Sequence, residues 1–212
     1  MCRLAIIGGS GISALPFLKD KKVFFLNRHG KNRNIPPHKI NHKKNLLKIK
    51  SMEIKKVIGV NSVGSLKLNI KPGSIIVPDD YINLKNIQTY YDIKAKHITP
   101  GLDETLRKEI INVAKRAKIR VIKKGIYIQT IGPRLETKAE INMLKDYGDI
   151  VGMTMANEAT LAKELGLRYA SICMVDNYAN GIIKKPLTFE MIKKTQKRNQ
   201  KRIARLLREL IK

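Results

Sequence analysis

The sequence predicts an α/β fold: a single domain with a mixed, mostly parallel central sheet flanked by helices. Short apolar runs of strand length alternate along the chain with segments of helical periodicity. The connections between these segments are short, which is typical of sheets whose strands are joined by helices. The chain has 212 residues, of which 43% are hydrophobic, so it can bury one sizeable core. We therefore expect one domain over residues 1–212.

The expected elements follow from the periodicity in chain order. We expect strands at 4–7, 23–26, 57–60, 74–77, 126–130, 150–152 and 169–175, and helices at 45–52, 103–117, 138–146, 158–165 and 187–210. The last strand is almost wholly apolar, as expected for a strand buried on both faces. Asp103 is the predicted N-cap of the second helix, because its side chain can accept from a free backbone N–H. Gly166 is the predicted end of the fourth helix.

The charge and composition exclude several classes of protein. Lys and Arg number 43 against 17 Asp and Glu, and this net charge of +26 suggests a polyanionic partner. The lysines are spread along the chain and aromatics make up only 5%, so we expect no specific nucleic acid partner. The sequence contains no run of 18 apolar residues, so we expect no membrane span. Two cysteines and the absence of a signal-peptide pattern favour a cytoplasmic protein.

A glycine-rich turn, 7–12, follows the first predicted strand. Small residues there allow backbone N–H groups to close on an anion. A rival interpretation is a dinucleotide site, because Gly9, Gly11 and Ala14 match the spacing G-x-G-x-x-A. That fold needs an acidic residue after the second strand, whereas this chain has Arg28 there. An arginine suits a phosphorylated ribose, so the rival is weakened and stays open.

Possible phosphate donors follow several predicted strands. Arg28 and His29 come after the second strand, Asn61 and Ser62 after the third, and Met153 and Thr154 after the strand at 150–152. An arginine can place two N–H groups on one phosphate. The carboxyl ends of neighbouring parallel strands meet at one edge of a sheet, where α/β folds bind ligands. The sequence therefore predicts an anion site at this edge. It has no Cys/His spacing typical of zinc, and we expect no metal.

The segment 132–140 places a carboxylate at the same edge. Gly132-Pro133 predicts a turn after the strand at 126–130. The turn brings Leu135 and Glu136 to the carboxyl end of that strand, where Glu136 can read a substrate.

Eight strings of the chain resemble, in order, the trimeric purine nucleoside phosphorylase family, and within it the methylthioadenosine phosphorylases. They lie at 6–11, 28–30, 35–41, 61–66, 72–76, 132–140, 152–158 and 169–177. The resemblance implies reversible phosphorolysis, in which inorganic phosphate attacks the anomeric carbon of a nucleoside and the purine leaves. Phosphate is then a co-substrate, and no cofactor is needed.

The resemblance also implies roles for individual residues. The phosphate-binding set is Ser10, Arg28, His29, Asn61, the Ser62 backbone and Thr154. The substrate-binding set is Leu135, Glu136, Met153 under the ribose, Asn177, Ala179 and His97. Within these sets Glu136, Asn177 and His29 are the expected catalytic residues. Because the residue matching His97 is supplied by a neighbouring subunit, the resemblance implies a homotrimer or homohexamer.

Glu136 and Asn177 decide the expected base. In the resembling family, methylthioadenosine phosphorylases have Ser at the first position, whereas 6-oxopurine enzymes have Glu, which accepts from N1–H. Adenosine-type enzymes have aspartates where this chain has Asn177 and Ala179. Adenine has a lone pair at N1, and a buried acceptor left unpaired costs about 1–3 kcal/mol. We therefore expect phosphorolysis of inosine, guanosine or 5′-methylthioinosine in purine salvage.

Two alternatives remain: a methylthioadenosine phosphorylase, or a basic α/β module that binds nucleic acid. The chain also departs from the family pattern. It is shorter between Gly11 and Lys21 and after Leu84, and it has Arg33 where the family has a histidine. The preference for a 5′-hydroxyl or a 5′-methylthio group therefore stays open.

Overall fold

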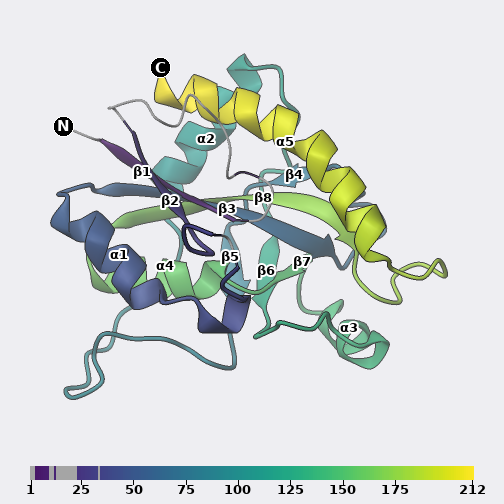
Figure 1. The fold of residues 1–212 in the computed structure, drawn as a ribbon, viewed down its shortest axis with the longest axis horizontal. Helices are drawn as coiled ribbons and strands as arrows, with labels where there is room; N and C mark the ends of the chain where they lie inside the picture. The colour runs from purple at the N-terminus through teal and green to yellow at the C-terminus, as the bar shows by residue number, and fades with distance from the viewer. Residues whose placement is uncertain (1–2, 10–11, 13–22, 33) are drawn as a thin grey trace.

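The structure is a computed structural model that describes residues 3–9, 12, 23–32 and 34–212. One eight-stranded sheet runs through the molecule (Figure 1). Its strands are β1 (Leu4–Gly8), β2 (Val23–Asn27), β3 (Lys56–Ser65), β4 (Ile75–Ile76), β5 (Asp80–Ile82), β6 (Ile126–Gln129), β7 (Ile150–Gly152) and β8 (Arg168–Tyr178). The order is β2-β1-β3-β7-β6-β5, and β8 pairs with β3 and β4. Among the described strands, only the β3–β7 and β4–β8 pairs are antiparallel, which confirms the mixed, mostly parallel sheet.

The helices lie on both faces of this sheet. They are the 3-10 helix η2 (Pro37–Lys39), α1 (His42–Ser51), α2 (Glu104–Arg116), α3 (Lys138–Leu144), α4 (Met155–Glu164) and α5 (Phe189–Ile211). Figure 1 shows α2 and α5 on one face and α1 and α4 on the other. Leu106, Ile110 and Leu206 belong to the first core layer, and Leu46, Ile49 and Leu161 to the second. The fold is therefore a sheet between two helical layers, as predicted.

All the predicted strands and helices are present, most of them with shifted ends. Asp103 accepts a 2.7 Å hydrogen bond from the backbone N–H of Leu106, so it is the N-cap of α2. Gly166 has φ +67° just after α4, which is the backbone conformation that glycine adopts most easily. α4 begins at Met155, three residues before the expected start, and β3 continues to Ser65. The prediction missed β5, because three residues carry no periodicity.

The pairing along β3 creates the opening in which a site can form. One edge of β3 pairs with β8 over its whole length, from Lys56 to Ser65. The opposite edge pairs with β1 at 56–60 and with β7 at 64–65. Both strands run toward residues 61–63 and end there, so within the described chain no strand covers this stretch. Asn61 and Ser62 were expected after the strand. They lie inside it, beside the ends of two neighbours.

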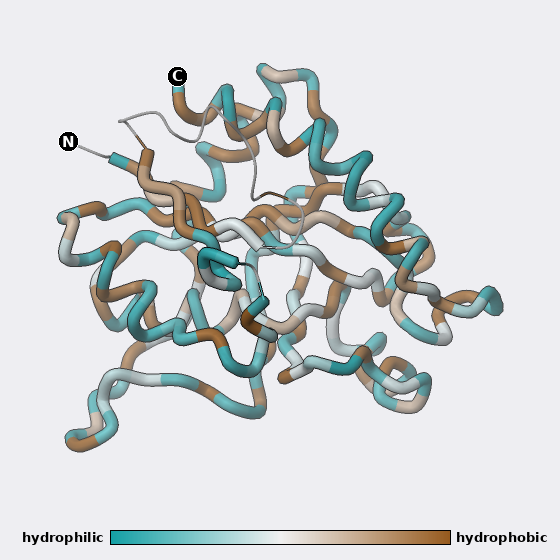
Figure 2. Tube along the Cα trace, viewed as in Figure 1, coloured by the Kyte–Doolittle hydropathy of each residue, from teal (hydrophilic) through white to brown (hydrophobic). Residues whose placement is uncertain are grey.

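Hydropathy follows the layers. Figure 2 shows hydrophobic colouring along the central strands, while α5 alternates between hydrophobic and hydrophilic residues along its 23 residues. Its buried apolar positions are Ile192, Ile203, Leu206 and Leu207. None of the helices in the described ranges is long and apolar enough to cross a membrane.

Candidate active site

A cavity of ≈ 230 Å³ lies at the uncovered stretch of β3. The cavity-lining residues that the sequence predicted are Arg28, His29, Asn61, Ser62, Leu135, Glu136, Met153, Thr154, Asn177 and Ala179. They come from β3 and β8 and from the residues that follow β2, β6, β7 and β8, so the fold collects segments that are far apart in the chain. Two predicted residues need separate mention. Ser10 lies outside the described residues, and His97 is exposed in the long segment between β5 and α2.

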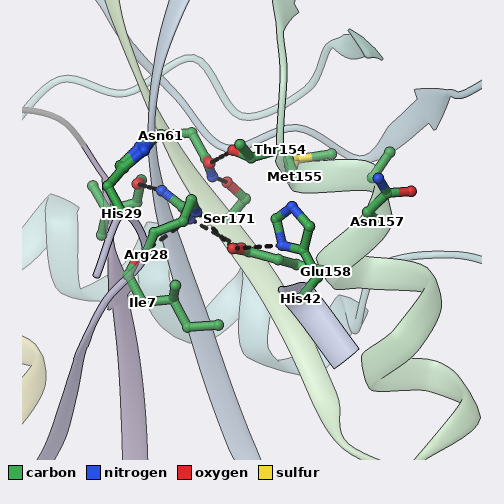
Figure 3. Close-up of polar contacts among 12 residues, drawn as sticks. Ile7, Arg28, His29, His42, Asn61, Thr154, Met155, Asn157, Glu158 and Ser171 are labelled. Carbon is green, nitrogen blue, oxygen red and sulfur yellow. Dashed lines mark hydrogen bonds and ion pairs between the residues drawn. The ribbon is translucent and has the colours of Figure 1, made fainter. Parts of the chain in front are cut away.

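Arg28 is buried, and two arms of its guanidinium contact another side chain although the residue lines the cavity. Nε donates a 2.6 Å bond to Oε1 of Glu158, and Nη2 donates a 2.9 Å bond to Oε2 (Figure 3). Nη2 also donates to the Ile7 carbonyl at 3.3 Å, and Nη1 to the Val60 carbonyl at 2.8 Å. The expectation that Arg28 would place two N–H groups on a phosphate is therefore wrong for this arrangement. These bonds use four of its five N–H groups, and one on Nη1 remains.

Glu158 is the functional candidate that the sequence did not identify. It lies on α4 and is 0% exposed. Burial raises the pKa of its carboxyl, but the Arg28 charge outweighs this effect, so the pKa is lowered overall. Tyr169 donates a 2.8 Å bond to Oε2 from the opposite side. One signal was present in the sequence: an isolated acid in the otherwise uncharged stretch 150–162, which predicts a buried charge that needs a partner.

Asn61 and Thr154 are joined to each other beneath the cavity. The Thr154 hydroxyl donates a 3.0 Å bond to Oδ1 of Asn61, whose Nδ2 donates a 2.8 Å bond to the Ser171 hydroxyl. All three residues are buried. Thr154 precedes α4 as its N-cap, but its side chain bonds to Asn61 and not to the helix. The pair thus fixes β3 against the end of β7.

The Ser62 side chain is bonded within the protein and does not serve as a phosphate donor. Its hydroxyl donates to Oδ2 of the buried Asp176 and accepts a 3.1 Å bond from Nε2 of Gln196 on α5. The Val60 carbonyl faces β1, because it accepts from Gly9 N–H at 3.2 Å. Backbone groups two residues apart on a strand face the same edge, so the Ser62 N–H also points to that edge. This geometry supports the backbone contact that the sequence analysis named.

His29 is half-buried at the end of β2. Its Nδ1 lies 2.8 Å from the Ile35 carbonyl, which can only accept, so Nδ1 carries a proton. Burial lowers the pKa of His29, and the neighbouring Arg28 charge acts in the same direction. A neutral His29 consequently has a lone pair on Nε2 and no proton to donate there.

Glu136 lies in the wall of the same cavity and is only 8% exposed. The Thr130 hydroxyl donates a 2.6 Å bond to its Oε1. Nδ2 of Asn180 donates a 3.3 Å bond to its backbone carbonyl. Side chain and backbone are therefore both held, while Oε2 has no bond among the described residues. Glu136 can accept one further proton donor from the cavity.

Asn177 and Ala179 continue this wall from β8 and the residues after it. Asn177 is half-buried, and one N–H of its Nδ2 donates a 2.8 Å bond to the Tyr178 carbonyl. Its second N–H and its Oδ1 remain for a ligand. Leu187, Phe189 and Ile192 bring an apolar surface from the start of α5 and the residues before it. The cavity thus has a polar end near Arg28, an acceptor and an amide near Glu136, and an apolar side.

The amino-acid sequence is similar to a known protein family and to several named proteins. A family model described as the phosphorylase superfamily matches residues 6–212. The chain is 40% identical to a probable 6-oxopurine nucleoside phosphorylase of Archaeoglobus fulgidus, with 99% of this chain and 96% of that one covered. It is 37% identical to a probable S-methyl-5′-thioinosine phosphorylase of Thermodesulfovibrio yellowstonii, covering 99% and 90%. An S-methyl-5′-thioadenosine phosphorylase of Pyrococcus abyssi is 32% identical, covering 100% and 92%.

Solved structures give the same result for the fold. A methylthioadenosine phosphorylase of Schistosoma mansoni in complex with adenine superimposes with a TM-score of 0.89 at 23% identity. The superposition covers 100% of this chain and 91% of that one. At this identity the likeness establishes the shared fold alone.

Proposed function

Since this chain belongs to the phosphorylase superfamily, we propose that it catalyses the reversible phosphorolysis of 6-oxopurine nucleosides. The substrates are inosine, guanosine or 5′-methylthioinosine, and the products are the free purine and the sugar 1-phosphate. The observation that carries the proposal is the position of Glu136, a buried acceptor held by Thr130 in the same cavity as Arg28, Asn61 and Thr154. One cavity thus contains residues that can bind phosphate and a carboxylate that can accept from a purine with a proton on N1.

The proposed chemistry needs no nucleophilic side chain. Phosphate attacks the anomeric carbon while the glycosidic bond breaks, so the sugar gains positive charge and the purine gains negative charge. Phosphate below the ring stabilises the first charge, and fixed donors near the base stabilise the second. The free N–H of Asn177 is such a donor for N7, and Oε2 of Glu136 accepts from N1–H. In this proposal the remaining Nη1 N–H of Arg28 and the Ser62 backbone N–H bind the phosphate oxygens.

Adenine nucleosides fit this wall less well. The lone pair of adenine N1 would face Oε2 of Glu136, and an unpaired buried acceptor costs about 1–3 kcal/mol. Methylthioadenosine phosphorolysis remains the second candidate, because an S-methyl-5′-thioadenosine phosphorylase is among the relatives. The apolar surface of Leu187, Phe189 and Ile192 accommodates a methylthio group without distinguishing the two bases.

We further propose that the active form is a homo-oligomer, a trimer or a pair of trimers. The support is the segment between β5 and α2, which Figure 1 shows extending away from the sheet. It carries His97 and exposes large apolar side chains, with Ile87 at 60% and Ile93 at 102%. Mixing a His97→Ala variant with an Arg28→Ala variant tests this proposal. Recovered activity is expected if sites form between subunits, and a monomer in sedimentation would contradict it.

The decisive experiment measures hypoxanthine release from inosine with and without phosphate. Adenosine, 5′-methylthioinosine and 5′-methylthioadenosine are assayed in parallel. We expect release that requires phosphate and that is at least tenfold faster for the 6-oxopurines than for the matching adenine nucleosides. Phosphate-independent release, or a preference for adenine, would contradict the proposal.

A further inference from the structure

We propose that Glu158 is the positioning residue of the phosphate subsite, and that it determines which N–H of Arg28 a phosphate can use. This inference rests on the proposed function. Glu158 does not line the cavity, whereas Arg28 does. It acts through Arg28 alone, by holding both arms of the guanidinium.

The contacts leave Arg28 one orientation. Both carboxylate oxygens of Glu158 accept from it, at 2.6 Å on Nε and 2.9 Å on Nη2. Nη1 is consequently directed toward β1 and β3, where it bonds to the Val60 carbonyl. A Cβ on Gly9 would lie 2.4 Å from Nη1, so the backbone of Gly9 lies directly against this nitrogen. Gly9 and Arg28 both line the cavity, and the free N–H of Nη1 therefore lies at its polar end.

Glu158 has neighbours on two further elements, and Figure 3 shows one of them, His42, beside its carboxylate. Tyr169 of β8 bonds to Oε2 at 2.8 Å, and Nδ1 of His42 on α1 lies 3.7 Å from Oε1. The second distance is too long for a hydrogen bond, so His42 acts as a buried wall beside the carboxylate. A Cβ on Gly59 of β3 would lie 2.0 Å from the Tyr169 hydroxyl. A glycine at 59 is what leaves space for this arrangement.

Stability alone does not account for the pair. The side chains of Arg28 and Glu158 are each 1% exposed, and removing two charges from water offsets most of their attraction. Such a pair is often replaceable by apolar residues without loss of stability. A pair that instead directs one N–H into a ligand cavity contributes orientation, which apolar residues cannot supply.

The test compares Glu158→Gln with Glu104→Gln. The first change places an amide N–H₂ against the N–H groups of Arg28, so the fork is broken while the volume is kept. The second is a control outside the cavity, because Glu104 pairs with the buried Arg107 while its own side chain is 58% exposed. For each variant we would measure the KM for phosphate, the KM for inosine, and the melting temperature with and without phosphate.

We expect Glu158→Gln to raise the KM for phosphate at least tenfold, with the KM for inosine within twofold of the wild type. The melting-temperature rise that phosphate causes should shrink in parallel. Glu104→Gln should lower the melting temperature and leave both KM values within twofold. If Glu158→Gln does not fold, Glu158→Asp, which retracts the same charge by one methylene, should give the same split.

Two results would overturn the inference: an unchanged KM for phosphate in the Glu158 variants, or parallel rises of both KM values. The second result would indicate a general structural role. Failure of the proposed function is a different outcome, because the wild-type chain would then show no phosphate-dependent cleavage at all. The melting shift with phosphate would still report on Arg28 in that case.

Discussion

The hydroxyl of Thr130 donates a 2.6 Å hydrogen bond to Oε1 of Glu136, which lines the same cavity as Arg28. Thr130 follows β6 directly and is itself half-buried. A donor at this oxygen keeps the carboxyl group in an accepting orientation, and Oε2 has no hydrogen bond among the described residues. Thr130 therefore links the core sheet to the residue that we expect to read the purine.

Thr130→Val should weaken purine recognition. Removing a hydrogen bond to a charged group costs about 1.5–3 kcal/mol, which corresponds to roughly a tenfold or larger loss. We expect kcat/KM for inosine to fall at least tenfold. Thr160→Val is the control, because it removes a hydroxyl 3.1 Å from Tyr81 in a region that does not line the cavity. Equal losses in the two variants would remove Thr130 from the recognition argument.

Glu136→Ser should reverse part of the base preference. The shorter side chain no longer places an acceptor against N1–H, so kcat/KM for inosine should fall by about 5- to 150-fold, equivalent to 1–3 kcal/mol. Adenosine loses an unfavourable contact, and its relative rate should rise. Parallel assays of both nucleosides check the change, with the melting temperature as the control for folding. Unchanged inosine turnover would contradict the role of Glu136.

Phosphate binding should become weaker as pH rises. Burial lowers the pKa of His29 below its ordinary value, so Nε2 is unprotonated at neutral pH and cannot donate to phosphate. Bound phosphate favours the protonated ring, and binding therefore takes up a proton. We expect the KM for phosphate to increase between pH 6 and pH 8.

Phosphate itself titrates in this range, so His29→Gln serves as the reference at every pH. The wild-type KM should change more steeply with pH than the KM of the variant. Coincident slopes would show that phosphate speciation alone causes the trend.

The buried Asp176 and the helix cap Asp103 should contribute to the free energy of unfolding with opposite pH dependence. Burial raises the pKa of Asp176, so the folded state holds this proton more tightly than the unfolded state. Its contribution to the free energy of unfolding then falls as pH rises from about 4 through the folded pKa. For Asp103, burial is outweighed by Arg168 and the pKa is lowered. That contribution is present above about pH 4 and is lost as pH falls.

Thermal melting tests these signs, for Asp176→Asn at pH 4.5 and 7.5, and for Asp103→Asn at about pH 3 and 7.5, on either side of the ordinary Asp pKa of about 3.9. The melting temperature of Asp176→Asn, relative to that of the wild type, should be higher at pH 7.5 than at pH 4.5. Asp103→Asn should be less favourable at pH 7.5, since Asn keeps the cap but loses the Arg168 ion pair, whose closest contact is 3.0 Å. The same sign in both variants would contradict the assigned shifts.

Local patterns in the sequence predicted the strands and helices and most of the residues that line the cavity. Apolar runs of strand length predicted β1, β2 and β7 nearly to the residue, because burial on a sheet imposes its own periodicity. Polar residues at strand ends predicted that Arg28, His29 and Thr154 would meet Glu136 at one edge. Those predictions depend on neighbours in sequence and on the direction of parallel strands.

The tertiary structure alone decided how those side chains are used. Arg28 and Glu158 are 130 residues apart, and no local pattern states that one will hold the other. The unpaired stretch of β3 arises because β1 and β7 approach it from opposite directions, which depends on the strand order. Hydrogen-bond partners are set by three-dimensional packing, since each buried donor must find an acceptor wherever the fold brings one. The sequence therefore determined which groups reach the cavity, and the fold decided which of their N–H and oxygen atoms remain free for a ligand.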